Sequence, residues 1–119
     1  MATQKKPILT ITRNATAAIA AYQAVTLLGA VAAAGADAAG FAISDAAIGQ
    51  DFGVDVLGTS TGLAGEALDE GVAVEVGADG TLVELSEGAR IGWTLFSAGA
   101  GQPVEVLIEK APAPPGGGG

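Results

Sequence analysis

The chain has 119 residues, of which 13 are acidic and 5 are basic, so its net charge is -8. This balance disfavours nucleic acid as a partner, because proteins that bind it gain affinity by neutralising phosphates. His and Cys are absent, which excludes the usual zinc ligands, imidazole and thiol catalysis, and disulfides. We therefore expect a protein that is not an enzyme and that has no cofactor and no metal site. The length suits one domain with a thin core, since 26 residues are alanine.

The first sixteen residues differ from the rest of the chain in charge. Three of the five cations lie here, and apolar and β-branched residues alternate after Pro7, as in a strand that begins at a proline. We predict an extended N-terminal arm over residues 1–16 that adds a strand to the sheet edge of an acidic partner. Neither a signal peptide nor a membrane-spanning stretch is recognised. The predicted docking residues are Lys5, Lys6, Ile8, Leu9, Ile11 and Arg13.

An alanine-rich segment, residues 15–24, follows the arm and favours a helix by intrinsic propensity. We predict strand instead, because a later segment with the same pattern contains Gly71 and alternating valines. Tyr22 and Phe52 lie in this half of the chain, and we predict that they contribute to an oligomer interface, where aromatic residues are enriched.

The chain contains an internal duplication with a period of about 50 residues. The two copies span residues 17–58 and 66–108 of a single β domain, residues 17–110, and we expect them to pack about a pseudo-twofold axis. The matched segments are residues 18–27 with 67–76, Gly40–Ile43 with Gly92–Leu95, Gly49–Gln50 with Gly101–Gln102, and Val54–Leu57 with Val104–Leu107.

The second copy has the clearest strand signals. Alternating valines over residues 72–76 and an Asp79-Gly80 turn predict a hairpin with residues 81–85. A strand is predicted over residues 91–95 and contains Trp93, the only tryptophan. The duplication aligns Trp93 with Phe41 of the first copy, and we expect it to fill the core. In the last strand, residues 103–109, valines alternate with carboxylates that we expect in solvent. The predicted fold class is all-β, a small barrel or sandwich, ending in a flexible Pro/Gly tail over residues 111–119.

Two candidate ligand sites do not satisfy the chemistry that they would need. Gly58–Gly62 resembles a phosphate loop but lacks the following Lys-Ser/Thr, and it is interpreted as the linker between the copies. Asp45, Asp51 and Asp55 lack the spacing of a calcium loop. Asp55 is interpreted as an exposed strand residue that matches Glu105 in the second copy.

In order and spacing, the segments from Pro7 to Ile108 resemble tailed-phage capsid cement proteins, also called head decoration proteins. The resemblance is carried by Ala17–Leu27, Gly40–Gln50, Val54–Gly58 and Gly99–Leu107. It implies a β-rich, non-enzymatic protein, made in the host cytoplasm, that binds the outer surface of the expanded icosahedral head in the virion. It also implies binding as a trimer or another small oligomer that bridges major capsid protein subunits and opposes the pressure of packaged DNA.

Two other classes remain open. A β-barrel module for a small ligand would need a sizeable pocket. A lipoyl-like carrier would need a modifiable lysine at a hairpin tip, and the predicted hairpin holds Ala78-Asp79-Gly80 there.

Overall fold

The computed structural model describes residues 6–113, and within them the fold is all-β with no α-helix. The molecule measures 38 × 37 × 24 Å. Lys5 and the end of the predicted tail lie outside the described residues. The elements in chain order are β1 (Pro7–Asn14), β2 (Ala24–Val25), β3 (Gly40–Ala42), β4 (Asp51–Leu63), β5 (Ala73–Val76), the short 3-10 turn η1 (Ala78–Gly80), β6 (Leu82–Glu84), β7 (Arg90–Thr94) and β8 (Pro103–Ala111).

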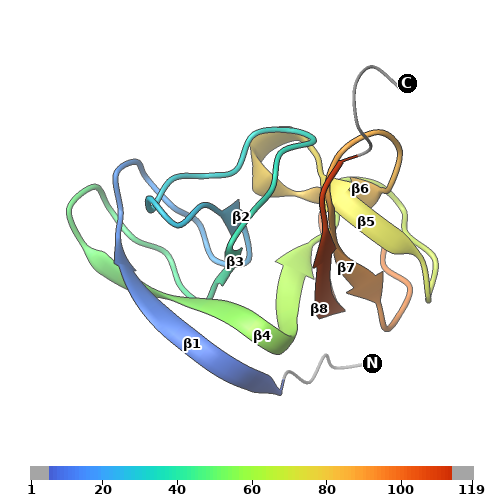
Figure 1. Cartoon of the computed structure of the whole chain (residues 1–119), viewed down its shortest axis with the longest axis horizontal. Helices are drawn as coiled ribbons and strands as arrows, with labels where there is room; N and C mark the ends of the chain where they lie inside the picture. Colours follow the sequence, from blue (N-terminus) through green and yellow to red (C-terminus); the bar gives the residue numbers. More distant parts are fainter. Residues whose placement is uncertain (1–5, 114–119) are drawn as a thin grey trace.

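The strands form one antiparallel sheet in the order β2-β3-β4-β8-β7-β5-β6, and β1 pairs with β4 beside this path. The strand β4 joins the two sides of the molecule (Figure 1). Its first part pairs with β1 and β3, and its last five residues pair with β8.

The change of partner along β4 occurs at Gly58. This residue has a φ of +90°, which glycine adopts without strain and other residues avoid. A side chain here would also come within 2.7 Å of the backbone nitrogen of Ile8. A linker was predicted at Gly58–Gly62, but this segment is part of β4, the strand that both halves of the molecule share.

The two halves of the molecule make the same backbone hydrogen bonds. The Ile19 amide donates to the Ala46 carbonyl and the Ala46 amide donates to the Ile19 carbonyl, and Leu68 and Ala98 repeat this exchange. Equivalent residues are 49 positions apart in the first part of each half and 52 positions apart in the later part, because the loops between these parts differ in length. Four such equivalences are Ala15 with Ala64, Ile19 with Leu68, Ala46 with Ala98, and Gly49 with Gly101. We call the first unit, which runs from β1 to the first part of β4, repeat 1. The second unit, which runs from the last part of β4 to β8, is repeat 2.

Strand register corrects the sequence alignment of the repeats. Thr94 pairs with Val106 as Ala42 pairs with Val54, so the equivalent of Val54 is Val106 and not Val104. The same register makes β1 equivalent to the end of β4: Asn14 pairs with Asp51 as Leu63 pairs with Pro103. Residues 7–14 are extended, as predicted, but they are the first strand of repeat 1 rather than an arm outside the body.

The core consists of two hydrophobic clusters of unequal size. The larger cluster combines residues of repeat 2 with Ala24, Ala32, Ala38 and Phe41 of repeat 1, whereas Trp93, the equivalent of Phe41, belongs to neither cluster. A twofold axis would give Phe41 and Trp93 equivalent surroundings. The repeats therefore pack head to tail, and the predicted pseudo-twofold packing is wrong. The smaller cluster contains Ala15, Ile19, Val25, Ala42, Ala46, Phe52 and Val54.

Three local predictions concern the alanine-rich segment, the Asp79-Gly80 hairpin and Trp93. Residues 15–23 are not helical, but only one isolated bridge, at Ile19, replaces the predicted strand before β2. The hairpin around Asp79-Gly80 is confirmed by the pairing of β5 with β6. In β7, a register irregularity after Arg90 turns Ile91 into the core and leaves Trp93 half-buried, so the core role predicted for Trp93 is wrong.

Candidate docking surface

The most exposed strand of the molecule is β1. Seven of its eight residues are exposed, including Ile8 at 79% and Leu9 at 46%. Within the part of the chain that the structure describes, β1 pairs only with β4. Alternate backbone N–H and C=O groups along its other edge therefore point away from the sheet, as expected for an edge strand.

Hydroxyl groups and buried carboxylates fix β1 to the body. The Thr10 hydroxyl donates to Asp55 Oδ1 at 2.7 Å, and the Ser60 hydroxyl donates to Asp55 Oδ2 at 2.7 Å. The Lys6 amide donates to Thr59 Oγ1 at 2.7 Å, and the Thr59 hydroxyl donates to a Glu105 carboxylate oxygen at 2.8 Å. These bonds hold β1 in one register and present its outer side chains on a fixed frame.

Both carboxylates were predicted to lie in solvent, and that prediction is wrong. Asp55 is 1% exposed and Glu105 is 6% exposed. They are also not equivalent, because Asp55 occupies the position of Leu107. The hydroxyl donors compensate for the loss of water around each carboxylate.

The structure separates the predicted docking residues into two groups. Lys6, Ile8, Leu9 and Arg13 are exposed. Ile11 is only partly exposed and packs against the smaller core cluster, so its contribution is to hold β1 in place.

Leu57 was not among the predicted docking residues. It pairs with Leu9 across the strands and is 49% exposed. Leu57 is three residues from the buried Val54, so strand alternation alone places it on the opposite face of β4, and the sequence therefore carried this signal. We call Lys6, Ile8, Leu9, Arg13 and Leu57 the β1 docking surface.

The two aromatic residues predicted at an oligomer interface differ in exposure. Phe52 is 3% exposed and lies in the smaller core cluster. Its ring fills the protein's own core, so the interface prediction is wrong for Phe52. Tyr22 is 37% exposed and has a φ of +74°, at the position that Gly71 occupies in repeat 2 with a φ of +78°. Its role at an interface stays a prediction.

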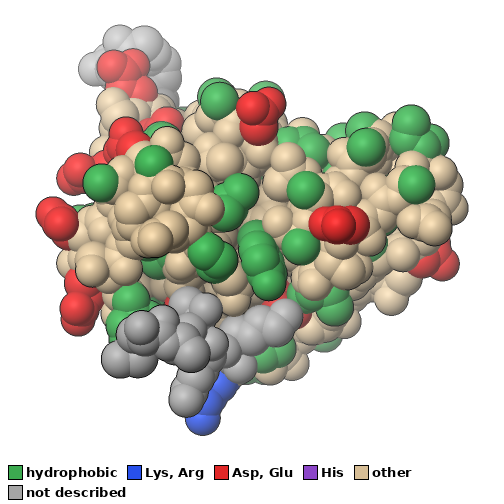
Figure 2. All heavy atoms as spheres, turned by 180° about the vertical axis from the view of Figure 1, so that it is seen from behind, with side chains coloured by type: hydrophobic (Ala, Val, Ile, Leu, Met, Phe, Trp, Pro, Cys, Tyr) green, Lys and Arg blue, Asp and Glu red, His purple; other side chains and the backbone are tan. Residues whose placement is uncertain are grey.

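Charge is distributed unevenly over the surface. On the face drawn in Figure 2, acidic side chains are spread widely, and one small basic group is visible at the lower edge. Lys6 and Arg13 stand at the two ends of β1, whereas Arg90 and Lys110 are paired with Glu109 and Asp37. The cations of β1 are therefore available to an acidic partner.

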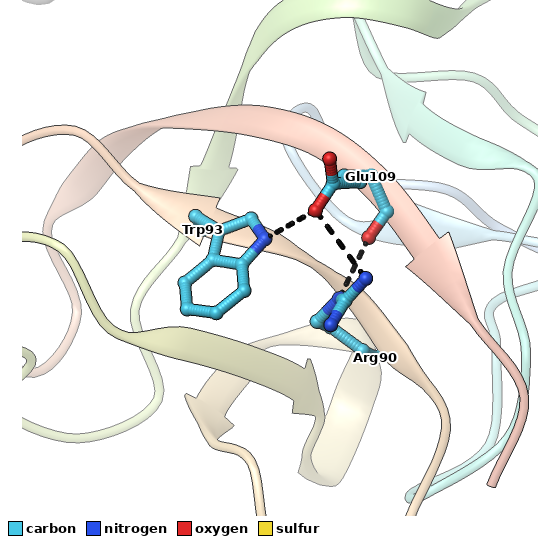
Figure 3. Close-up of polar contacts among 3 residues, drawn as sticks. All are labelled: Arg90, Trp93 and Glu109. Carbon is cyan, nitrogen blue, oxygen red and sulfur yellow. Dashed lines mark hydrogen bonds and ion pairs between the residues drawn. The ribbon is translucent and has the colours of Figure 1, made fainter.

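Trp93 forms a polar cluster on the outer face of repeat 2 (Figure 3). Its indole N–H donates to Glu109 Oε1 at 2.8 Å, and the Arg90 guanidinium lies 5.1 Å from the ring centroid. Arg90 Nη2 also pairs with Glu109 Oε1 at 3.3 Å. The cluster ties β7 to β8 and leaves part of the ring in solvent.

The three aspartates considered as calcium ligands are engaged separately. Asp45 accepts the Ala21 amide, Asp51 accepts the Asn14 side-chain amide, and Asp55 accepts two hydroxyls. Among residues 6–113, no three His, Cys, Asp or Glu side chains are grouped so that they could hold a metal ion.

A shallow pocket of about 470 Å³ lies beside the end of β8. Its charged groups, Asp37 and Lys110, face each other at 3.6 Å, and no aromatic side chain lines it. The pocket thus lacks the convergent polar groups and the aromatic lining typical of small-molecule sites. Separately, no helix among the described residues is long and apolar enough to cross a membrane.

The fold and the surface define a small duplicated all-β protein with an exposed, basic edge strand. No family model matches the sequence, and no curated protein is significantly similar to it. Among solved structures, the N base of head fiber gp8.5 from bacteriophage phi29 has a TM-score of 0.73 at 22% identity, over 85% of this chain and 93% of that chain. The two proteins share their fold over nearly their whole length.

Proposed function

We propose that this chain is a structural protein of a bacteriophage virion that binds the outer surface of the expanded head. The observation that supports this most is the β1 docking surface on a body with the fold of a phage head-fiber base. The surface has apolar anchors between two cations, on a protein whose net charge is -8. Such an edge suits strand addition, in which main-chain hydrogen bonds supply affinity and side chains supply specificity.

The partner in this proposal is the major capsid protein. A lattice presents many copies of one site, so a modest contact becomes strong when a small oligomer engages several sites at once. An oligomer that bridges neighbouring capsid subunits stabilises the expanded state by mass action and opposes the pressure of packaged DNA. This role needs no catalytic group.

Co-sedimentation with expanded, undecorated heads tests the proposal. Deletion of β1 is a poor variant, because the strand is part of repeat 1 and its loss would expose the smaller core cluster. The double variant Ile8→Asp/Leu9→Asp keeps the strand and replaces its apolar anchors, both of which are exposed. Ile48→Asp, at a loop residue that is 71% exposed, is the matched control.

We expect saturable binding by the natural chain and by the control, and at least tenfold weaker binding by the double variant. Binding should also weaken as ionic strength rises, because the cations of β1 are screened. Equal binding by all three proteins would remove β1 from the contact. No binding by any of them to competent heads would refute the proposed function.

A further inference from the structure

The head-to-tail packing of the repeats buries one face of repeat 1. Phe41, paired with Ala24 on β2 and Asp55 on β4, is fully buried. A side chain at Gly62 would come within 3.0 Å of Phe41 Cε1 and 2.6 Å of Leu82 Cδ1, so both side chains lie over Gly62 of repeat 2. The outer face of repeat 1 is thus an internal interface.

Apart from the Arg90 guanidinium, which lies 5.1 Å from the Trp93 ring centroid, no described residue covers the equivalent face of repeat 2 in this way. Trp93 is paired with Ala73 on β5 and Leu107 on β8, in the register of Phe41. Ala73 and Trp93 are half-buried and Leu107 is 40% exposed. Within the described chain, the Trp93 face therefore has apolar side chains in partial contact with solvent, at positions whose equivalents in repeat 1 are buried.

The cover of the repeat 1 face comes from the β5-β6 hairpin. Leu82 of this hairpin packs in the larger cluster with Phe41, and the Asp79 carbonyl at its tip accepts the side-chain amide of Gln23 at 2.8 Å. The internal interface therefore shows what this kind of face binds: the tip and the apolar side chain of a β-hairpin.

Repeat 1 has an equivalent, shorter hairpin, and the two leucine side chains at its tip are exposed. Val25 bridges to Val31, and the Thr26 amide bonds to the Ala30 carbonyl. Leu27 and Leu28 form the tip and are 59% and 77% exposed. The tip of the longer hairpin in repeat 2 has small or polar residues, Ala78 and Asp79. Leucines are thus not needed to form a tip of this fold.

We propose that the Leu27-Leu28 hairpin of one molecule docks on the Trp93 face of a second copy of this chain, continuing the head-to-tail order of the repeats. Strand register places Arg13 at the position of Gly62. Because Arg13 has a side chain where Gly62 has none, two copies would lie further apart there than the repeats do. The Arg13 guanidinium of one copy would then face Glu109 of the next, whose side chain is 58% exposed and also pairs with Arg90. The contact joins two different surfaces, so it generates a ring where the rotation closes and a chain where it does not.

Two variants, each blocking one side of the contact, test this proposal by complementation. Leu27→Ser/Leu28→Ser removes the tip and leaves the face, whereas Leu107→Arg blocks the face and leaves the tip. All three positions are at least 40% exposed, and far-ultraviolet circular dichroism and the urea midpoint verify folding. Ile48→Ser, outside both surfaces, is the control. Sedimentation velocity over a concentration series measures assembly, and the fluorescence of Trp93 reports on the face.

We expect oligomers of the natural chain and the control, and association at least tenfold weaker for each blocked variant alone. An equimolar mixture of the two blocked variants should form a dimer and nothing larger, with the Trp93 emission shifted to shorter wavelength. The proposal is overturned if the natural chain stays monomeric up to millimolar concentration, if either blocked variant assembles normally, if the mixture forms no dimer, or if the control also fails to assemble. None of these outcomes depends on heads, so the proposal stands or falls separately from the proposed function.

Discussion

At the residue scale, the buried carboxylates show where sequence patterning stops being informative. An acidic residue between two valines predicts a solvent-facing position, and both Asp55 and Glu105 fit that pattern. Burial is tolerated because side-chain hydroxyls donate to both carboxylates. The donors Thr10, to Asp55, and Thr59, to Glu105, are 45 and 46 residues away in sequence. Such long-range partners depend on the register of β1 and β4, which no local pattern specifies.

The burial of Asp55 leads to a stability prediction. Asp55→Ala should lower the free energy of unfolding by about 1 to 3 kcal/mol, because the hydroxyls of Thr10 and Ser60 lose their acceptor in a buried site. Urea denaturation followed by Trp93 fluorescence measures the change. Asp69→Ala, at an exposed acidic residue, should change stability by less than about 0.5 kcal/mol. Equal effects would show that the Asp55 network contributes nothing specific.

The backbone of Tyr22 leads to a second prediction, based on its φ of +74°. Tyr22→Ala and Tyr22→Gly both remove the ring, but only glycine adopts this conformation without strain from a Cβ atom. The glycine variant should therefore be more stable than the alanine variant by about 1 kcal/mol. Thermal or urea unfolding of the two variants measures the difference, and an alanine variant as stable as the glycine variant would contradict the strain.

At the element scale, the sequence predicted which segments are extended better than how they pair. The hairpin around Asp79-Gly80 and the last strand follow from turn chemistry and alternation. The place of β1 does not, because its equivalence to the end of β4 relates Ile8–Thr12 to Leu57–Thr61, and only the two threonines are identical. Without that match, an apolar strand beside a duplicated body was interpreted as an arm.

The bend in β4 can be tested with one glycine. Gly58→Ala should lower stability by more than Gly49→Ala, although φ is +90° at both positions. At Gly49 a Cβ atom has no neighbour within 4 Å, whereas at Gly58 it meets the backbone of β1. Each variant bears about 1 to 2 kcal/mol of left-handed strain, and Gly58→Ala adds the displacement of β1. Urea midpoints of the two variants decide, and equal losses would show that β1 does not constrain the bend.

At the scale of the whole molecule, composition and alternation were sufficient to predict an all-β domain, but not its internal order. The alanine-rich core allows repeat 2 to pack closely on repeat 1, and this packing determines which aromatic residue is buried. Phe41 is covered and Trp93 is not, although the sequence places both at the same repeat position. The docking residues on β1 could be named from charge and alternation, whereas the pairing of Leu57 with Leu9 and the open Trp93 face required the strand register.

The most direct test of the structural role is the temperature at which DNA-filled, undecorated heads release their DNA. Heads saturated with this protein should release DNA at a higher temperature, because a ligand of the intact lattice stabilises it by mass action. The Ile8→Asp/Leu9→Asp variant, added at the same concentration, should leave the temperature near that of bare heads. An unchanged release temperature on heads shown to be saturated with the natural chain would contradict the account.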